Sequence, residues 1–291
     1  MARPELHAAY WSISGDCYAS GPTEVSPFDF RERVEVAGKV GYKGVGFVHQ
    51  DLMAVADRIG WKTMKQILDD NGMKYVEVEI IGDWFTDGAK RKASDIIRKD
   101  LLNAAEKLGA WHIKIGGDIE NDGAYPWPMD KMVAELKVLA DQAAGVGTKL
   151  ALEIMPFSNF KTIDQAVELM QGAGKKNAGI MLDIWHVARG NIPFGEILKM
   201  PKELLFWVEI DDARKDVEGS LYNDTVHNRE LPGEGDLDIQ EFLRAVRDIG
   251  YTGPYGVEII SYEHRVRSLQ DQAQIVYDTA MAQFDTLDKG K

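Results

Sequence analysis

Short apolar runs alternate along this chain with longer segments whose apolar residues recur at helical spacing. The short runs are rich in Val, Ile, Leu and aromatic residues, which is typical of strands. The predicted strands are His7–Ile13, Gly44–Val48, Tyr75–Ile81, His112–Gly116, Leu150–Ile154, Ile180–Ile184, Leu205–Ile210 and Tyr255–Ile260.

The segments between these runs predict helices. They are Pro27–Val40, Asp51–Leu68, Ile96–Leu108, Met132–Ala143, Ile163–Met170, Phe194–Leu198, Asp238–Ile249 and Leu269–Phe284. We expect Ser26 to cap the first helix, with Pro27 in its first turn, and Gly41 to end it.

Strict alternation of strands and helices favours a parallel sheet with helical crossovers, which is an α/β fold. Eight such units in 291 residues match the size of a single (β/α)8 TIM barrel. An open doubly wound sheet is the alternative, but no G-x-G-x-x-G follows the first strand, which disfavours nucleotide binding. No linker interrupts the pattern, so we predict one domain over residues 1–291.

Composition and charge narrow the class of protein. The formal net charge of −13 makes a nucleic-acid partner unexpected, because an acidic surface repels phosphate backbones. Cys17 is the single cysteine, so no intrachain disulfide can form, which suits a reducing cytosol. Met1–Tyr10 has no signal-peptide core, and no run approaches the ~20 apolar residues of a membrane span. We therefore expect a soluble cytoplasmic protein that does not bind membranes.

Four consecutive predicted strands carry an acid toward their carboxyl ends, where the strands of such a barrel surround one mouth. They are Glu153, Asp183, Glu209 and Glu258. For any one of them, a buried salt bridge or a solvated acid is an equally good interpretation. Four acids brought together by barrel closure repel one another unless positive charge lies between them. A bound cation answers that need, and an all-oxygen shell suits Mn²⁺ or Mg²⁺, with Co²⁺ possible; zinc would recruit more His or Cys.

The order of these motifs resembles the xylose-isomerase-like sugar isomerase/epimerase family. The resemblance runs from about His7 to Phe284. It is carried by Leu152-Glu153, Leu182-Asp183-x-x-His186, Val257-Glu258 and the loop Arg229–Gly235. It implies that Glu153, Asp183 and Glu258 bind a metal, and that His186 and Arg229 contact substrate hydroxyls.

This chain departs from the family's pattern in the seventh strand. The family usually has His-x-His there, with the second histidine as a metal ligand, whereas this chain reads Trp207-Val208-Glu209. Glu209 therefore takes the ligand position. Asp211, two residues on and facing the same way, is the alternative ligand.

Further candidates for substrate contact are Glu79, His49 and Trp11. Glu77 and Glu79 alternate inward on the third strand, and an ion pair inside the barrel with Lys114 is an equally good reading. His49 could equally be a loop histidine without a role, and packing is the better reading for Trp11. The other residues noted near strand ends are Trp84, Trp185, His227, His264 and Arg265, the last two as possible caps of the final helix.

The resemblance implies an isomerase or epimerase of a ketose or keto-sugar, in which Glu153 or Glu258 removes the proton alpha to the carbonyl. A dehydratase or lyase acting on an inosose, a dehydroshikimate-like compound or a 3-keto-glycoside remains an alternative. So does a non-catalytic carbohydrate-binding subunit of a heteromer. The DNA-repair enzymes that share this fold have histidine-rich three-zinc sites, which the 6 histidines here disfavour. We also expect a homo-oligomer.

Overall fold

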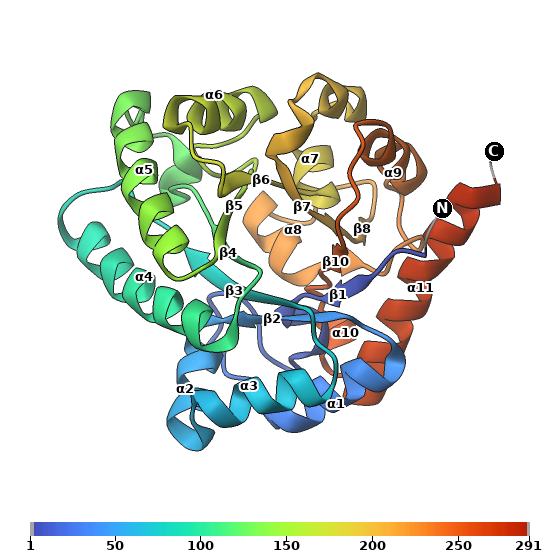
Figure 1. Cartoon of the computed structure of the whole chain (residues 1–291). Coiled ribbons are helices and arrows are strands. Elements are labelled where there is room, and N and C mark those ends of the chain that lie inside the picture. Colours follow the sequence, from blue (N-terminus) through green and yellow to red (C-terminus); the bar gives the residue numbers. More distant parts are fainter. Residues whose placement is uncertain (1–2, 290–291) are drawn as a thin grey trace.

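The computed structural model describes residues 3–289, the side chains of 288 and 289 excepted, so residues 1, 2, 290 and 291 of the predicted domain lie outside it. Eight parallel strands close into a barrel in the order β1-β10-β7-β6-β5-β4-β3-β2, as Figure 1 shows. The strands are β1 (Leu6–Ala8), β2 (Gly44–Val48), β3 (Tyr75–Ile81), β4 (His112–Ile115), β5 (Lys149–Glu153), β6 (Ala178–Asp183), β7 (Leu205–Ile210) and β10 (Tyr255–Val257). The predicted TIM barrel is therefore confirmed, and the open sheet is excluded.

Helices surround the barrel and bury their apolar faces against the strands (Figure 1). The α-helices are α1 (Phe30–Val40), α2 (His49–Ile59), α3 (Trp61–Asp70), α4 (Gly88–Leu108), α5 (Met129–Gly145), α6 (Ile163–Ala173), α7 (Ile184–Arg189), α8 (Leu221–His227), α9 (Ile239–Asp248), α10 (Tyr262–Arg265) and α11 (Leu269–Lys289). The 3-10 helices are η1 (Tyr10–Ile13), η2 (Glu120–Gly123), η3 (Phe194–Lys199) and η4 (Lys202–Leu204). No helix among the described residues is long and apolar enough to cross a membrane.

Several predicted helix boundaries are wrong, and two of them differ for clear local reasons. The helix expected from Pro27 begins at Phe30, and the side chain of Asp29, not that of Ser26, accepts the hydrogen bond that caps it. The helix expected over Asp51–Leu68 is divided at Gly60, whose φ of 77° lies outside the helical region. Apolar residues recur at helical spacing across the delayed start at Phe30 and across Gly60, so spacing alone could not locate either boundary.

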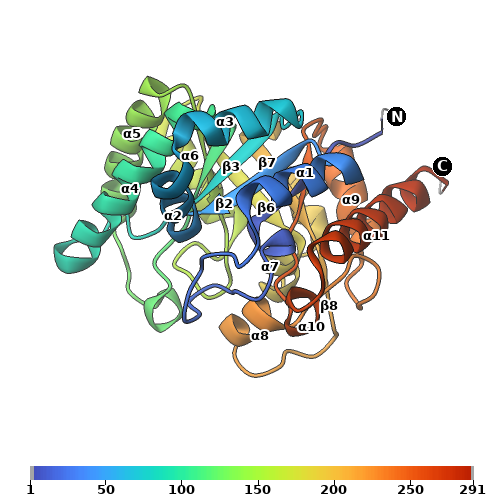
Figure 2. The ribbon, with the colours of Figure 1, turned by 90° about the horizontal axis from the view of Figure 1, so that it is seen from below.

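The predicted first strand is also too long, because β1 ends at Ala8 and η1 follows it. The polar segment after β7 contains structure that no hydrophobic period signalled, namely α8 and a two-stranded pair of β8 (Asp212–Ala213) with β9 (Arg229–Glu230). In Figure 2, α8, α10 and β8 lie together at one edge of the molecule, away from both termini. Residues of α8 and β9 line the cavity at the mouth of the barrel.

Inward-facing glycines make room for large polar side chains inside the barrel. A Cβ on Gly256 of β10 would lie 2.6 Å from Cγ of Glu209, and one on Gly44 of β2 would lie 2.7 Å from Cδ2 of His7. Adjacent strands fill the space with charged and aromatic residues instead of the usual branched aliphatic ones. The interior of the barrel is consequently polar beneath the mouth.

Candidate functional site

The four strand-end acids converge at the mouth of the barrel. Glu153 ends β5, Asp183 ends β6 and lies opposite Glu209 of β7, and Glu258 directly follows β10. Each offers a carboxylate oxygen, these atoms all lie within 4.8 Å of one another, and all four side chains are buried. His186, in the first turn of α7, forms a second such group with Glu153 and Asp183.

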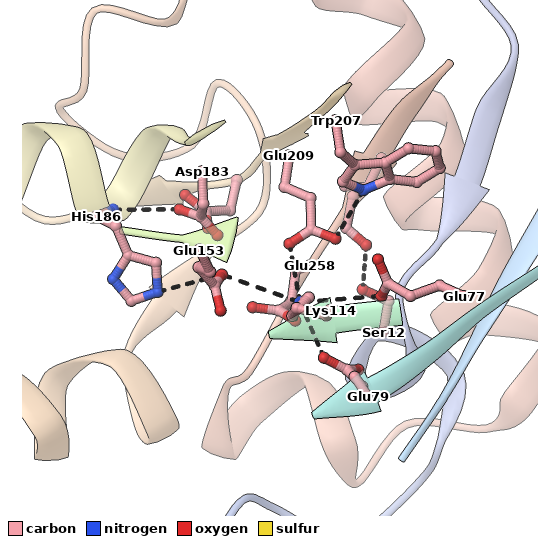
Figure 3. A network of polar contacts seen from close by, with 12 residues as sticks. Ser12, Glu77, Glu79, Lys114, Glu153, Asp183, His186, Trp207, Glu209 and Glu258 are labelled. Carbon is pink, nitrogen blue, oxygen red and sulfur yellow. Dashed lines mark hydrogen bonds and ion pairs between the residues drawn. The ribbon is translucent and has the colours of Figure 1, made fainter. Parts of the chain in front are cut away.

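The ammonium of Lys114, from β4, lies among these acids (Figure 3). Its Nζ is 2.9 Å from Glu79, 3.2 Å from Glu258, 3.3 Å from Glu209, and 3.9 Å from both Glu77 and Glu153. The lysine is only 1% exposed. From the sequence we expected a bound cation to relieve the repulsion among these acids, but an ammonium of the protein already lies between them. The protein supplies part of the positive charge itself.

Arg229, in β9, supplies a second cation. Its Nη1 lies 2.5 Å from Asp183 and also donates to Asp211, and its Nη2 lies 3.2 Å from Glu258. Thr225 of α8 accepts a 2.8 Å hydrogen bond from Nη2, which fixes the guanidinium. Asp211 is thus held by Arg229 and lies outside the group of four convergent acids, whereas Glu209 lies within it.

The buried cluster still carries more acids than cations. Seven carboxyl groups face Lys114 and Arg229, and they are Glu77, Glu79, Glu153, Asp183, Glu209, Asp211 and Glu258. Two fixed positive charges cannot neutralise all of them, so the remainder must be met by protons or by a further cation.

The pKa values of the buried acids reflect the excess of carboxyl groups over cations. Burial, reinforced by neighbouring carboxylates and opposed by Lys114, raises the pKa of Glu79 and of Glu153 to about 8. Burial likewise raises the pKa of Glu209 and Asp211 well above their usual range. Burial would also raise the pKa of Glu77, but Lys114 and His112 outweigh it and lower that pKa to about 2.

The donor set fits a hard divalent cation. Glu153 Oε1 is buried and makes no hydrogen bond within residues 3–289, although it faces the other three acids. Carboxylate oxygens are the ligands that such cations prefer. An ion bound here would neutralise two charges that otherwise require protons on buried carboxyls.

A cavity of about 420 Å³ opens above the cluster. All five residues predicted to contact substrate line it: His186, Arg229, Glu79, His49 and Trp11. The remaining wall is largely apolar and comes from loops after several strands. A cavity with charged groups at its floor and apolar sides is suited to a small ligand.

The imidazole of His186 is poised beside the acids in its neutral form. Its Nε2 lies 3.6 Å from Glu153, and burial together with the charge of Arg229 lowers its pKa well below the usual range. His49 instead pairs with Asp100 at 2.9 Å on the cavity wall. Of the two histidines, His186 is therefore the one in reach of the carboxylates.

The other candidates have structural partners. The ring of His227 stacks on Tyr262, and His264 contacts the carbonyl oxygen of Ser12 at 2.8 Å rather than capping the final helix. Arg265 pairs with Asp16 at 3.0 Å. Separately, Trp84 donates to the carbonyl of Gly116, which fixes it as a packing residue.

Sequence reasoning missed the residue that holds Glu258 in place. The hydroxyl of Ser12 donates to the carbonyl of Val257 and accepts from the amide of Ile259, both at 2.8 Å. It therefore brackets Glu258, which lies just beyond the regular hydrogen bonds of β10. A serine in an expected strand gives no sequence signal for this role, whereas Lys114 was identifiable from its inward register beside Glu77.

This chain is similar to a known protein family and to several curated enzymes. Residues 34–279 match the family described as "Xylose isomerase-like TIM barrel". An inosose isomerase of Halalkalibacterium halodurans is 27% identical over 148 residues, which are 50% of this chain and 51% of that protein. A 3-dehydroshikimate dehydratase of Pseudomonas putida is 23% identical over 249 residues, which are 83% of this chain and 38% of that protein. The chain thus spans about half the length, or less, of these curated relatives.

Among solved structures, one described as the "IOLI protein with a binding zinc atom" superposes with a TM-score of 0.82 at 18% identity, covering 98% of both chains. At that identity the likeness establishes the fold. The family match covers most of the chain, from α1 into α11. This chain therefore belongs to the xylose isomerase-like TIM-barrel family.

Proposed function

We propose that this protein is a divalent-metal-dependent isomerase or epimerase of a ketose or keto-sugar. The observation that carries the proposal is the convergence of Glu153, Asp183, Glu209 and Glu258 beneath a cavity that Glu153 and Glu258 help to line, with an excess of buried negative charge. Among the relatives of this chain, an inosose isomerase bears the name of such a reaction.

The four convergent acids would hold the metal, and we propose Mn²⁺ because every donor in the set is a carboxylate oxygen. When bound, a divalent ion supplies Lewis-acid polarisation of the substrate carbonyl. The protein's own residues then govern binding and proton transfer.

Proton transfer falls to Glu153 and Glu258, which reach the cavity from β5 and from the end of β10. One of them removes the proton alpha to the carbonyl and holds it; either the other delivers a proton of its own to the opposite face, or the first delivers the proton to the neighbouring carbon. Return to the opposite face gives an epimer, and return to the neighbouring carbon gives an aldose–ketose isomer. His186 and Arg229 orient hydroxyl groups in the cavity.

A dehydratase or lyase is the second candidate. It is supported by the match to the P. putida 3-dehydroshikimate dehydratase, which extends over 83% of this chain. The first step is the same proton abstraction, after which a beta substituent leaves. His186, 3.6 Å from Glu153, is placed to assist the departing group.

A screen in deuterated water tests both candidates. Purified protein with added Mn²⁺ is incubated with keto-sugars, inososes and 3-keto-glycosides, and deuterium at the alpha carbon is measured by NMR. We expect exchange on one class of substrate, with an epimer, isomer or elimination product identifying the reaction. Lack of bound metal combined with lack of exchange on every compound would instead support a carbohydrate-binding protein.

The variant Glu258→Gln tests the assigned base. An amide cannot accept the proton, so we expect turnover to fall by about 10³-fold. Metal content is measured in the same preparation. Near-normal turnover with metal bound would refute the role of Glu258.

A further inference from the structure

Among the described residues, Lys114 is the basic side chain that contacts the most carboxyl groups. Its ammonium contacts acids from β3, β5 and β7 and the acid after β10 (Figure 3). Three of the contacted acids, Glu153, Glu209 and Glu258, also belong to the group that could hold a metal, and Glu209 and Glu258 are the nearer two.

Glu209 is the acid that stands where the family usually has a neutral histidine, so it adds one more carboxyl group to the site. Both of its oxygens are engaged: Oε1 accepts from Nε1 of Trp207 at 3.2 Å, and Oε2 lies 3.3 Å from Lys114. The added acid is therefore matched by a cation within the same cluster.

The position of Lys114 puts it in conflict with a metal ion. Its Nζ lies 3.2 Å from Oε1 of Glu258 and 3.3 Å from Oε2 of Glu209, two acids of the group that could hold the ion. Two cations held by the same carboxylates at this range repel each other strongly in a buried site.

We infer that Lys114 is a built-in cation that competes with the divalent metal for Glu209 and Glu258, and thereby sets the metal affinity of this centre. The inference rests on the proposed metal site. Lys114 is accordingly a determinant of metal affinity in a chain whose ligand set is more acidic than the family's usual one.

The cluster also provides a place for the displaced ammonium. Glu79 is 2.9 Å and Glu77 is 3.9 Å from Nζ, and both belong to β3, outside the group of metal-ligating acids. A small shift of the lysine toward β3 keeps it paired while it frees Glu209 and Glu258. A metal ion could therefore displace Lys114 from Glu209 and Glu258 without leaving the buried ammonium unpaired.

The experiment compares Mn²⁺ affinity by isothermal titration calorimetry in the wild type and in Lys114→Met. Removing one unit charge a few ångströms from a doubly charged ion should tighten binding at least about tenfold. The matched control is Lys149→Met. That lysine opens β5 at the opposite end of the barrel, where its ammonium lies over the ring of Trp111. We expect wild-type affinity from the control.

A second pair of variants covers the case in which Lys114→Met fails to fold. In the Glu209→His background, removal of Lys114 leaves fewer acids unpaired, and we again expect tighter binding in the double variant than in Glu209→His alone. Equal or weaker affinity without Lys114 in folded protein overturns the inference while leaving the metal centre standing. An equal gain in Lys149→Met overturns it as a general charge effect. Absence of Mn²⁺ binding from every variant overturns the inference and the proposed metal site together.

Discussion

The buried charge cluster has two halves, one around Lys114 and one around Arg229, and they are built differently. Lys114 spreads its charge over five carboxylates at 2.9 to 3.9 Å. Arg229 makes close, directed contacts with Asp183 and Asp211, is braced by Thr225, and stacks at 5.5 Å on Trp185. A guanidinium has a rigid fork of donors, whereas an ammonium is a compact point charge on a flexible stem. The arginine half therefore fixes geometry, and the lysine half balances charge.

The two halves meet at Glu258. Its Oε1 lies 3.2 Å from Lys114, and its Oε2 lies 3.2 Å from Nη2 of Arg229. This carboxylate is thus positioned by the arginine and neutralised by both cations. The comparison predicts that the two halves will respond differently to mutation and to pH.

The largest expected effect comes from breaking the arginine half. Arg229→Met leaves Asp183, Asp211 and one oxygen of Glu258 without their cation in a buried site. Breaking such a pair costs about 3–5 kcal/mol, and we expect a loss of that size in the free energy of unfolding measured in urea.

The control for that measurement is Arg214→Met. Arg214 pairs with Glu218 and Glu230, but its side chain is 59% exposed, so solvent screens these pairs and its removal should lower the free energy of unfolding far less than removal of Arg229. If the two arginine variants lost similar stability, the arginine half would not be the rigid element that its contacts indicate.

The lysine half should control how stability depends on pH. The pKa of Glu79 and of Glu153 is raised from 4.5 to about 8, so both bind a proton more tightly in the folded than in the unfolded protein. Their contribution is complete below pH 4.5 and is lost as the pH rises to about 8. Below pH 6.5, buried His7 and His264, whose pKa burial lowers to about 4, act in the opposite direction. Metal-free protein should therefore lose about 1 kcal/mol or more per pH unit between about pH 6.5 and 8.

Urea unfolding in EDTA at several pH values measures this slope. Glu79→Gln should reduce it, because one of the carboxyl groups whose pKa is raised in the folded protein is gone. Glu106→Gln, an exposed acid of α4, should leave it unchanged. Saturating Mn²⁺ should flatten the slope, since a bound cation favours the ionised carboxylates. A slope that is the same in Glu79→Gln and the wild type would place the titrating groups outside the lysine half.

The sequence predicted the parts of this molecule that repeat. Alternating apolar periods indicated the closed barrel, and strand-end positions indicated that Glu153, Asp183, Glu209 and Glu258 would converge. Both follow from rules that apply to every strand of a barrel. The division of the second predicted helix at Gly60 needed a backbone angle that apolar spacing does not report.

The pairing of the buried acids with Lys114 and Arg229 could not be predicted in the same way. Lys114 was visible as an inward residue, but its reach across the barrel to Glu209 and Glu258 depends on the room left by inward glycines such as Gly256. Arg229 lies in β9, just after α8, and this placement brings it to Asp211. Both elements form in a polar segment that has no hydrophobic period. The positions of these two cations relative to the acids therefore depend on packing that the sequence pattern does not report.

The smallest expected effect concerns the backbone beneath Glu258, where the two halves meet. Ser12→Ala removes both the donor to the carbonyl of Val257 and the acceptor for the amide of Ile259. We expect about a tenfold loss in kcat with KM and metal content nearly unchanged, because a misplaced base lowers reactivity more than binding. Ser14→Ala is the matched control, since its hydroxyl reaches only the carbonyl of Trp11, within its own turn, at 3.5 Å. Unchanged kcat in Ser12→Ala would mean that Lys114 and Arg229 position Glu258 without help from the backbone, whereas a parallel loss of metal would assign Ser12 to the binding site as a whole.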